Sequence, residues 1–330
     1  MGAVSADAGR AILGEGGIPS FATPEAAVGA FGNLATFYQN QLLLQQTPPP
    51  MSTLAKPDVE GARLIIESVL AERRSALTEL ESKTLLSSFL IPVTQTVRAR
   101  SATEAMMLAT QLGFPVALKI DSPDIAHKSD VQGVALDLAN GAAVRDAYTD
   151  MVERVARLKP QARINGVTVQ KMAPARRGRE INIGVVTDDP FGPVIVFGAG
   201  GTMIELIDDR AMELPPLNQY LARRLIERTR VAETLGEWRG APPVQMEAVE
   251  QILLRVSEMV CELPWIAEMD INPVIVDEGG LVAVDARVVL DPAVGASPAR
   301  HAHMAIMPYP AHLTRVLAAP DGGFYTLRAI

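Results

Sequence analysis

Apolar positions recur along the chain at two spacings, one typical of helices and the other of strands. A spacing of three or four residues predicts two amphipathic helices, with apolar faces made of Val28, Phe31, Leu34, Ala35 and Tyr38 and of Val144, Tyr148, Met151, Val155 and Leu158. Similar patterns predict helices over 217–230 and 245–263. Thr23-Pro24 adds a helix N-cap followed by proline at the first helical position, so the first of these helices should begin there.

Short apolar runs bounded by turn residues predict strands over 116–120, 167–172, 180–187, 193–198, 271–276 and 281–288, and a short one after Gly16-Gly17. The turn at 188–192 should join two of them in a hairpin. Thr78 with Glu81, and Ser101 with Glu104, have the spacing of capping boxes that open helices. Hairpins mixed with helices predict α+β layers more than a purely parallel sheet.

The length of 330 residues corresponds to about two domains. Residues 1–47 hold too few elements to bury a core alone. We therefore expect them to dock on the next domain or to be the end of a domain that was cut away. Residues 45–50 have the composition of a stiff, polar linker.

Composition excludes several classes of protein. A hydrophobic fraction of 48% with 21% charged residues is that of a folded chain. No apolar run approaches the roughly 18 residues of a membrane span, and the N-terminus does not resemble a secretory signal. A net charge of −8 disfavours sequence-independent binding to nucleic acid. The single cysteine, Cys261, excludes an internal disulfide and predicts a cytoplasmic location.

The last two predicted strands bring oxygen ligands together. If strands 271–276 and 281–288 pair across the turn between them, Asn272 lies opposite Asp285. If the strand extends back to 268, alternation adds two carboxylates to the same face, those of Glu268 and Asp270. Mg²⁺ prefers such ligands when phosphates supply the rest of its shell. The alternative is a solvated hairpin face.

Lys119 lies inside the apolar strand 116–120, where its charge is costly unless it is matched, for instance by phosphate oxygens. The alternative is an edge-strand lysine that reaches water. A polar loop, 121–130, follows and contains His127. Histidine suits proton or phosphoryl relay near neutral pH, and the alternative is an ordinary surface histidine.

Two further segments have the composition of nucleotide-binding elements. Residues 169–172 end a strand, whose backbone could face an adenine edge while Met172 covers the ring. Residues 197–202 are rich in glycine, including Gly200 and Gly201, and let backbone N–H groups approach phosphate. The alternative for this second segment is a tight turn. No dinucleotide fingerprint, P-loop or zinc spacing is present.

These features occur in a fixed order: Lys119 on a strand, Ser-Pro-Asp-Ile-Ala-His-Lys-Ser-Asp at 122–130, Val169–Met172, Gly178-Arg-Glu at 178–180, Phe-Gly-Pro at 191–193, the glycine run with Glu205, Asp-Ile-Asn-Pro at 270–273 and Asp-Ala-Arg at 285–287. Over roughly residues 60–290 this order resembles the ATP-grasp domain of the NDP-forming acyl-CoA synthetases, the group of ADP-forming acetate–CoA ligases. The resemblance implies an ATP-grasp fold of the α+β (α/β) class, with two subdomains that sandwich the nucleotide.

The resemblance also implies ATP and Mg²⁺ as cofactors and a role for each matched residue. Lys119 would hold ATP phosphates, and His127 would pass phosphate between sites. Glu180 would touch the nucleotide, with the ribose as its candidate contact. Adenine would be framed by Val169, Gln170, Lys171 and Met172. Metal ligands would be Asn272 and Asp285, with Glu205 and Asp270 as weaker candidates.

One position departs from the family pattern, since the motif near 132 often has two glycines and this chain has Gln132-Gly133. The primary phosphohistidine of the family lies in an upstream domain that this sequence does not contain.

The flanks extend the resemblance. Residues 8–46 look like the end of a CoA-ligase domain, and 309–330 are similar to the lead-in to a GNAT acetyltransferase domain. The expected layout is a CoA-ligase remnant at 1–47, a linker at 48–59, the ATP-grasp domain at 60–292 and a tail at 293–330. Expected partners are ATP and ADP, a CoA-binding domain and a GNAT domain, with a homo-oligomer left open.

Two functions follow from this resemblance. In the first, the chain is the MgATP-binding part of an acid–CoA ligase that makes acyl-CoA through a phosphohistidine. In the second, it is a catalytically silent nucleotide or metabolite sensor attached to a GNAT protein acetyltransferase.

Overall fold

A computed structural model describes residues 3–45, 55–125, 127–172, 178–201, 209–238, 240–295, 301–307, 314–318 and 324–328. The chain divides into two compact units, residues 1–49 and 50–330. None of the described helices is both long and apolar enough to cross a membrane.

The first unit contains two helices, α1 (Ala3–Glu15) and α2 (Pro24–Gln45). The predicted cap of α2 is confirmed, because Thr23 Oγ1 accepts a hydrogen bond of 3.2 Å from Ala26 N. The short strand expected after Gly17 is wrong: residues 18–21 are irregular, and no described strand pairs with them. The apolar side chains of α2 named above remain mostly exposed.

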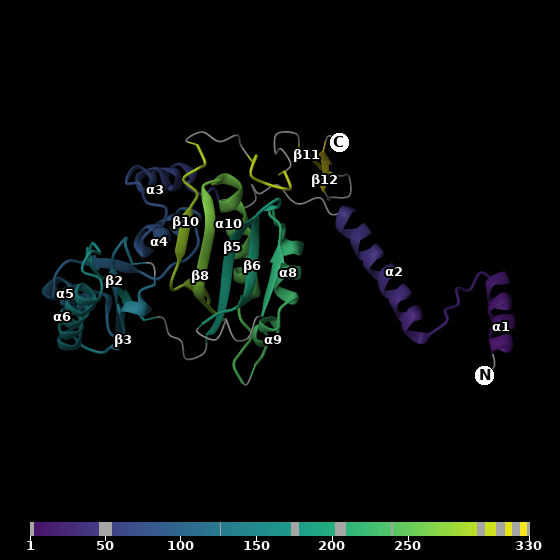
Figure 1. Cartoon of the computed structure of the whole chain (residues 1–330), viewed down its shortest axis with the longest axis horizontal. Helices are drawn as coiled ribbons and strands as arrows, with labels where there is room; N and C mark the ends of the chain where they lie inside the picture. Colours follow the sequence, from purple (N-terminus) through teal and green to yellow (C-terminus); the bar gives the residue numbers. More distant parts are fainter. Residues whose placement is uncertain are drawn as a thin grey trace. The chain divides into compact units, whose positions relative to one another are not determined.

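The second unit contains a four-stranded antiparallel sheet in the order β1-β4-β2-β3 (Figure 1). Its strands are β1 (Thr96–Ala99), β2 (Val116–Asp121), β3 (Val134–Leu138) and β4 (Gly166–Lys171). Two helices, α5 (Ala102–Leu112) and α6 (Gly141–Leu158), pack on the sheet through one apolar core, and a short 3₁₀ turn, η2 (Ser129–Val131), follows β2. The predicted capping pair of α5 is half confirmed: Ser101 accepts from Glu104 N, whereas the Glu104 carboxylate accepts from Arg100 N, one residue upstream of the cap.

A six-stranded antiparallel sheet follows, in the order β10-β8-β5-β6-β7, with β9 paired to β8. Its strands are β5 (Arg179–Asp188), β6 (Gly192–Ala199), β7 (Arg210–Glu213), β8 (Ile266–Asp277), β9 (Gly280–Ala283) and β10 (Arg287–Leu290). Five helices share its apolar core: α3 (Val59–Ala71), α4 (Glu79–Ser88), α8 (Gln219–Glu227), α9 (Val231–Leu235) and α10 (Met246–Glu262). A separate two-stranded sheet pairs β11 (Thr314–Ala318) with β12 (Phe324–Arg328).

The α+β prediction is confirmed, because every strand pair described is antiparallel. The hairpin predicted over 180–198 is confirmed as β5 and β6. The helix expected over 217–230 is shorter, since α8 ends at Glu227 and α9 begins at Val231. The Asp209 carboxylate accepts hydrogen bonds of 2.7 Å from both Arg230 N and Val231 N, and thereby caps the second helix.

The strand expected over 281–288 is wrong as a single element, because it is interrupted between β9 and β10. The same register relates β9 and β10 to β8 on both sides of the interruption. Pro273 of β8 lies across from it and has no N–H to donate to a ladder. Residues 284–286 therefore lie outside the strands, although Val284 N still donates to Pro273 O at 3.0 Å.

Helix α4 connects the two sheets. Its capping box is confirmed, with Thr78 and Glu81 bonded reciprocally. Its apolar side chains Leu85 and Leu86 belong to the core of the six-stranded sheet. On another face, Lys83 Nζ donates a hydrogen bond of 2.7 Å to Gln170 Oε1 of the four-stranded sheet. Helix α4 thus brings charged groups to the sheet face opposite α5 and α6.

Candidate nucleotide and metal site

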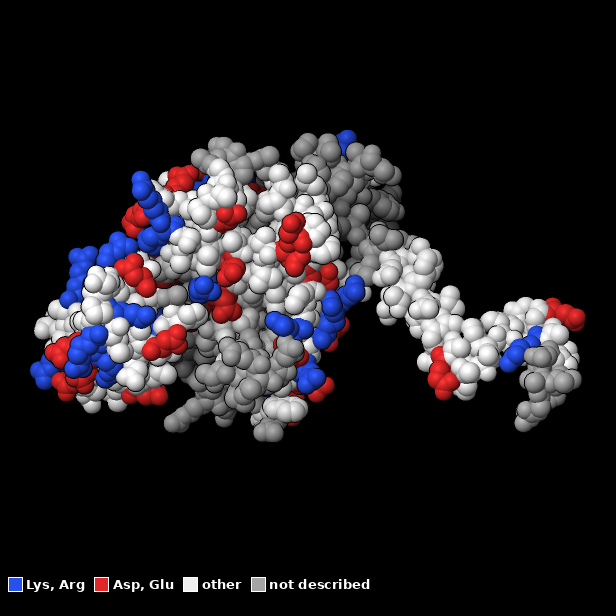
Figure 2. Space-filling model, viewed as in Figure 1, with Lys and Arg blue, Asp and Glu red and all other residues white. Residues whose placement is uncertain are grey.

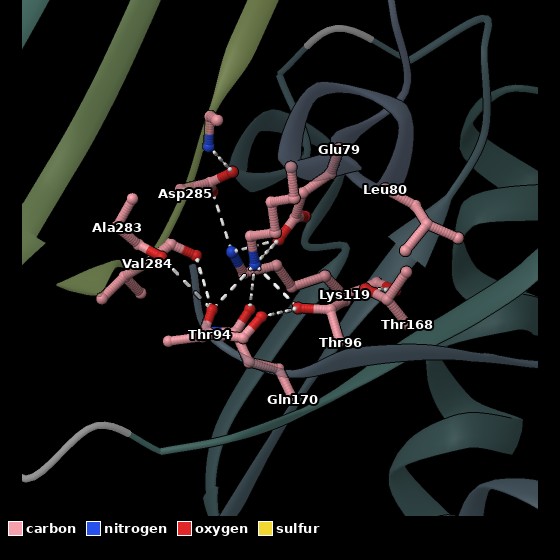
Figure 3. Close-up of polar contacts among 12 residues, drawn as sticks. Glu79, Leu80, Thr94, Thr96, Lys119, Thr168, Gln170, Ala283, Val284 and Asp285 are labelled. Carbon is pink, nitrogen blue, oxygen red and sulfur yellow. Dashed lines mark hydrogen bonds and ion pairs between the residues drawn. The ribbon is translucent and has the colours of Figure 1, made fainter. Parts of the chain in front are cut away.

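Lys119 is buried in the middle of the four-stranded sheet. Strand β2 pairs with β4 on one side and β3 on the other, so the alternative of an edge-strand lysine reaching water is wrong. The Lys119 Nζ atom donates to Glu79 Oε1 and to Asp285 Oδ2, each at 2.9 Å (Figure 3). Burial lowers the pKa of Lys119, but the two carboxylates outweigh it and raise the pKa above its usual value.

Glu79 is the carboxylate around which the buried charges gather. Its side chain is 1% exposed and pairs with three lysines: Lys83 and Lys119 at Oε1, both at 2.9 Å, and Lys128 at Oε2, at 3.1 Å. Burial raises the pKa of Glu79, and the three ammonium charges outweigh burial and hold the pKa well below its usual range. Glu79 is therefore ionised at neutral pH.

Lys83 is anchored by neutral oxygens as well as by Glu79. Its Nζ donates to Thr94 Oγ1, Thr96 Oγ1 and Gln170 Oε1 at 2.7–3.0 Å (Figure 3). Burial lowers the pKa of Lys83 to about 8, against the opposing effect of Glu79. This cluster of four oxygens fixes the ammonium group in one place.

Asp285 lies in the interruption between β9 and β10. Because the register is the same on both sides, Asn272 lies across from it, as the hairpin prediction required. Asp285 Oδ1 accepts from Ala286 N at 2.9 Å, which leaves Oδ2 for Lys119. The Asp285 side chain is 36% exposed, so it faces both the lysine and solvent.

Asn272 contacts the end of the glycine segment. Its Oδ1 accepts a hydrogen bond of 2.9 Å from Gly201 N. Gly201 has a φ of 82°, and a Cβ there would collide with the Glu180 carboxylate. Gly200 N donates to Glu180 O at 2.9 Å. The structure therefore brings together Glu180, Gly200, Gly201 and Asn272.

Asp270 lies on the same face of β8 as Asn272, as alternation predicts. The intervening side chains, Met269 and Ile271, are buried on the other face. Its Oδ1 accepts from Asn182 Nδ2 at 2.9 Å. Both residues line a hollow of about 470 Å³ over the six-stranded sheet, together with Gly184, Gly198, Glu268 and Arg287. Burial and the nearby Asp285 charge raise the pKa of Asp270. Glu268 and Asp270 thus supply carboxylate oxygens to this hollow.

The segment expected to frame adenine has its side chains in different places. Val169 packs in the core beneath α5 and α6, and Gln170 is turned toward Lys83. Strand β4 is paired along both edges. Lys171 is exposed, and Met172 N donates to Pro115 O at 3.1 Å. Lys171 and Met172 are therefore the members of this segment that remain accessible at the strand end.

His127 is exposed in the loop after β2, and its neighbour Lys128 reaches Glu79. Glu205 lies outside the described residues. Among the residues that the structure describes, no three His, Cys, Asp or Glu side chains gather closely enough to hold a metal ion. Acidic and basic side chains alternate over the visible face rather than forming one basic field (Figure 2).

A family model described as an ATP-grasp domain matches residues 68–290. The β subunit of ADP-forming acetate–CoA ligase I from Pyrococcus furiosus is 38% identical over 232 residues, which are 70% of this chain and 99% of that subunit. The chain belongs to the ATP-grasp family of ADP-forming acyl-CoA ligases. It is the counterpart of the ligase β subunit.

Other members of this family differ in how much chain they contain. ADP-forming acetate–CoA ligase I from Archaeoglobus fulgidus is 35% identical over 290 residues, 88% of this chain and 41% of the relative. This ATP-grasp chain thus covers nearly all of a separate β subunit and about two-fifths of that longer ligase.

Solved structures of acetyl-coenzyme A synthetase 1 from Ca. Korarchaeum cryptofilum share the ATP-grasp fold. One, in complex with coenzyme A, Ca-AMPCP and HgCl⁺, is 40% identical with a TM-score of 0.67 and covers 70% of this chain and 100% of its own. Another, with coenzyme A and Mg-AMPPCP, has its phosphohistidine segment pointing towards the nucleotide-binding site. It is 36% identical with a TM-score of 0.61, and the match again covers 70% of this chain and 100% of the solved one.

Sequence reasoning did not find four of the residues that shape this candidate site: Glu79, Lys83, Lys128 and Asn182. A signal was present for two of them, since Glu79 and Lys83 are four residues apart at the start of a recognised helix. Such pairs usually lie on a solvated helix face, and only the packing of α4 against β2 and β4 makes this one buried.

Proposed function

We propose that this chain binds MgATP between its two sheets and serves as the phosphoryl-donating part of an acid–CoA ligase. The ligase would make acyl-CoA and ADP from a carboxylate, CoA and ATP through a phosphohistidine. The observation that carries the proposal is the contact between Lys119 and Asp285. A lysine ammonium group can bind phosphate, and a carboxylate can bind Mg²⁺, so the two side chains together suit MgATP.

The donor set present fits MgATP. Asn272 and Asp285 supply hard oxygen atoms across from each other, and Asp270 adds a carboxylate on the same strand face, whose pKa burial and the Asp285 charge raise. Asn272 and Asp285 would hold Mg²⁺, with Asp270 and Glu205 as weaker ligands. The bound Mg²⁺ would neutralise phosphate charge during transfer.

This chain's other residues would bind and orient the nucleotide. Lys119 would hold the phosphates, and the backbone at Gly200 and Gly201 would approach them. Glu180 would contact the nucleotide near Gly201. The strand end after Val169 and Gln170, at Lys171 and Met172, would frame adenine. His127 would relay phosphate; the Korarchaeum relative has a phosphohistidine segment that points towards its nucleotide-binding site.

Calorimetric titration of ATP, with and without Mg²⁺, into this chain and into its Asp285→Ala variant tests the proposal. We expect micromolar binding, about −8 kcal/mol, that requires Mg²⁺ and is lost in the variant. Absence of binding at millimolar ATP in the unaltered chain would contradict the proposal.

A second candidate is a catalytically silent sensor fused to a GNAT acetyltransferase. It rests on the similarity of 309–330 to a GNAT lead-in, in a segment beyond the family match at 68–290. The accompanying layout is a CoA-ligase remnant at 1–47, a linker at 48–59, an ATP-grasp domain at 60–292 and a tail at 293–330. The coding sequence on either side tests it: an upstream active-site histidine favours the ligase, and its replacement together with a downstream GNAT domain favours the sensor.

A further inference from the structure

The carboxylate of Glu79 contacts two lysines that belong to different functional segments. Its Oε1 accepts from Lys119 on β2, where phosphate would bind, at 2.9 Å. Its Oε2 pairs with Lys128 at 3.1 Å, and Lys128 directly follows His127. One side chain from α4 thus reaches both the phosphate position and the histidine loop.

Glu79 is itself held in place by a fixed group. Lys83, one turn along the same helix, donates to Glu79 Oε1 and to three neutral oxygens of Thr94, Thr96 and Gln170. These oxygens come from the chain leading into β1, from β1 itself and from β4. Because these oxygens hold the Lys83 ammonium group on the four-stranded sheet, it anchors the Glu79 carboxylate there.

The two carboxylates that pair with Lys119 would have different roles once a nucleotide binds. Lys119 has two carboxylate partners, Glu79 and Asp285. If Asp285 turns to a metal ion, Glu79 is the carboxylate that stays with Lys119. A buried ammonium group that keeps one fixed partner also keeps its position.

The loop that carries His127, residues 122–133 (the histidine loop), is bonded to β2 through its backbone. Gly133 N donates to Lys128 O at 2.8 Å, and Ile120 N donates to Gly133 O at 2.7 Å. The side-chain pair between Lys128 and Glu79 is the complementary tie, from the loop to α4. The loop is therefore fastened both to β2 and to the helix that orients Lys119.

We propose that Glu79 is a positioning residue that holds Lys119 at the phosphate site and, through Lys128, holds the His127 loop at a fixed place relative to it. This inference rests on the proposed MgATP site. It assigns to α4 the alignment of the nucleotide phosphates with the histidine that is to receive or pass phosphate.

The test compares Glu79→Gln with Glu79→Asp and with a matched control, Glu81→Gln. Glu81 lies on the same helix, but its carboxylate binds Arg74 and Thr78 N and touches neither Lys119 nor Lys128. Calorimetry gives the affinities for MgATP and for AMP, which lacks the outer phosphates. Amide hydrogen exchange reports on residues 122–131.

We expect Glu79→Gln to weaken MgATP binding about tenfold while AMP binding changes by less than about twofold. The loop amides should exchange faster, and Glu79→Asp should recover part of the affinity because it restores the charge. In Glu81→Gln the ratio of MgATP to AMP affinity should equal that of the unaltered chain. Equal loss of both nucleotides in Glu79→Gln would indicate a purely structural role and overturn the inference.

Two further outcomes keep the inference separate from the proposed function and from a folding defect. If the unaltered chain binds no MgATP, the proposed function itself fails; if it binds and Glu79→Gln keeps the same ratio, only the role of Glu79 fails. If Glu79→Gln does not fold, Lys128→Gln, whose side chain is 17% exposed, replaces it. Faster exchange over 122–131 in that variant supports the inference, and unchanged exchange contradicts it.

Discussion

The Nζ atom of Lys119 lies 2.9 Å from Oδ2 of Asp285, although the two residues are 166 positions apart in the sequence. The contact joins β2 of the four-stranded sheet to the interruption between β9 and β10 of the six-stranded sheet. In the proposed site these groups have different ligands, phosphate for the lysine and Mg²⁺ for the carboxylate. Binding of MgATP therefore has to replace the ion pair that holds them together.

Substitution of Asp285 by asparagine should change ATP affinity in opposite directions with and without metal. Without Mg²⁺, the variant should bind ATP about fivefold more tightly, because a carboxylate that repels phosphate and competes for Lys119 is gone; this corresponds to about 1 kcal/mol. With Mg²⁺, it should bind more weakly, because a metal ligand is lost. Calorimetry at fixed ionic strength measures both.

The control for Asp285→Asn is Asp291→Asn, since Asp291 lies after β10 and its carboxylate accepts from Ala293 N, away from Lys119. That variant should bind ATP like the unaltered chain under both conditions. Parallel weakening of both forms of ATP in Asp285→Asn would be inconsistent with competition for Lys119.

Glu79→Gln should destabilise the chain, and the loss should shrink in acid. At pH 7 the variant leaves three lysine contacts without their carboxylate, a loss of about 3–5 kcal/mol. The pKa of Glu79 is lowered in the folded state, so its contribution is complete above the unfolded pKa of about 4.3 and is lost as pH falls toward the folded value. At pH 3.5 the difference from the unaltered chain should be about 1 kcal/mol smaller than at pH 7.

Urea unfolding at the two pH values measures this change. The exposed carboxylates that titrate in both proteins cancel in the difference. A difference that stays constant or grows in acid would show that Glu79 does not carry the lowered pKa.

Adjacent positions in the histidine loop should respond oppositely to substitution. Gln132 has a φ of 52°, a left-handed conformation that favours glycine, so Gln132→Gly should preserve or raise stability by up to about 1 kcal/mol. A Cβ on Gly133 would lie 2.5 Å from Cγ2 of the buried Ile120, so Gly133→Ala should cost about 1–3 kcal/mol. Thermal unfolding of the two variants tests the pair, and the same sign for both would contradict it.

Cys261 should resist thiol reagents while the chain is folded. It is 1% exposed, and burial raises the pKa of its thiol to about 12. Since it is the single cysteine of the chain, a maleimide or disulfide reagent at pH 8 reports on it alone. Labelling should proceed in urea at the rate of unfolding; rapid labelling in native buffer would contradict the burial of Cys261.

Local patterns predicted most elements and one cross-strand pair. Turn residues at 188–192 indicated the β5–β6 hairpin, and a constant register placed Asn272 across from Asp285. Alternation also put Asp270 on the exposed face of β8. Strand register and capping depend on nearby residues, which is why the sequence was informative about them.

The remaining features depend on contacts between distant segments. The break between α8 and α9 is capped by Asp209, which comes from before β7. The ion pair of Asp285 with Lys119 joins residues 166 positions apart. Glu79 and Lys83 have the spacing of a surface pair and are buried because α4 packs against a sheet formed later in the chain.

The most direct test of this account is a crystal structure of the chain with Mg-AMPPCP. We expect Lys119 Nζ within hydrogen-bond distance of a phosphate oxygen, Asp285 and Asn272 at the metal, and the Lys119–Asp285 pair opened while Lys119 keeps its contact with Glu79. A nucleotide bound elsewhere, with the 2.9 Å contact between Lys119 and Asp285 intact, would contradict the proposed site.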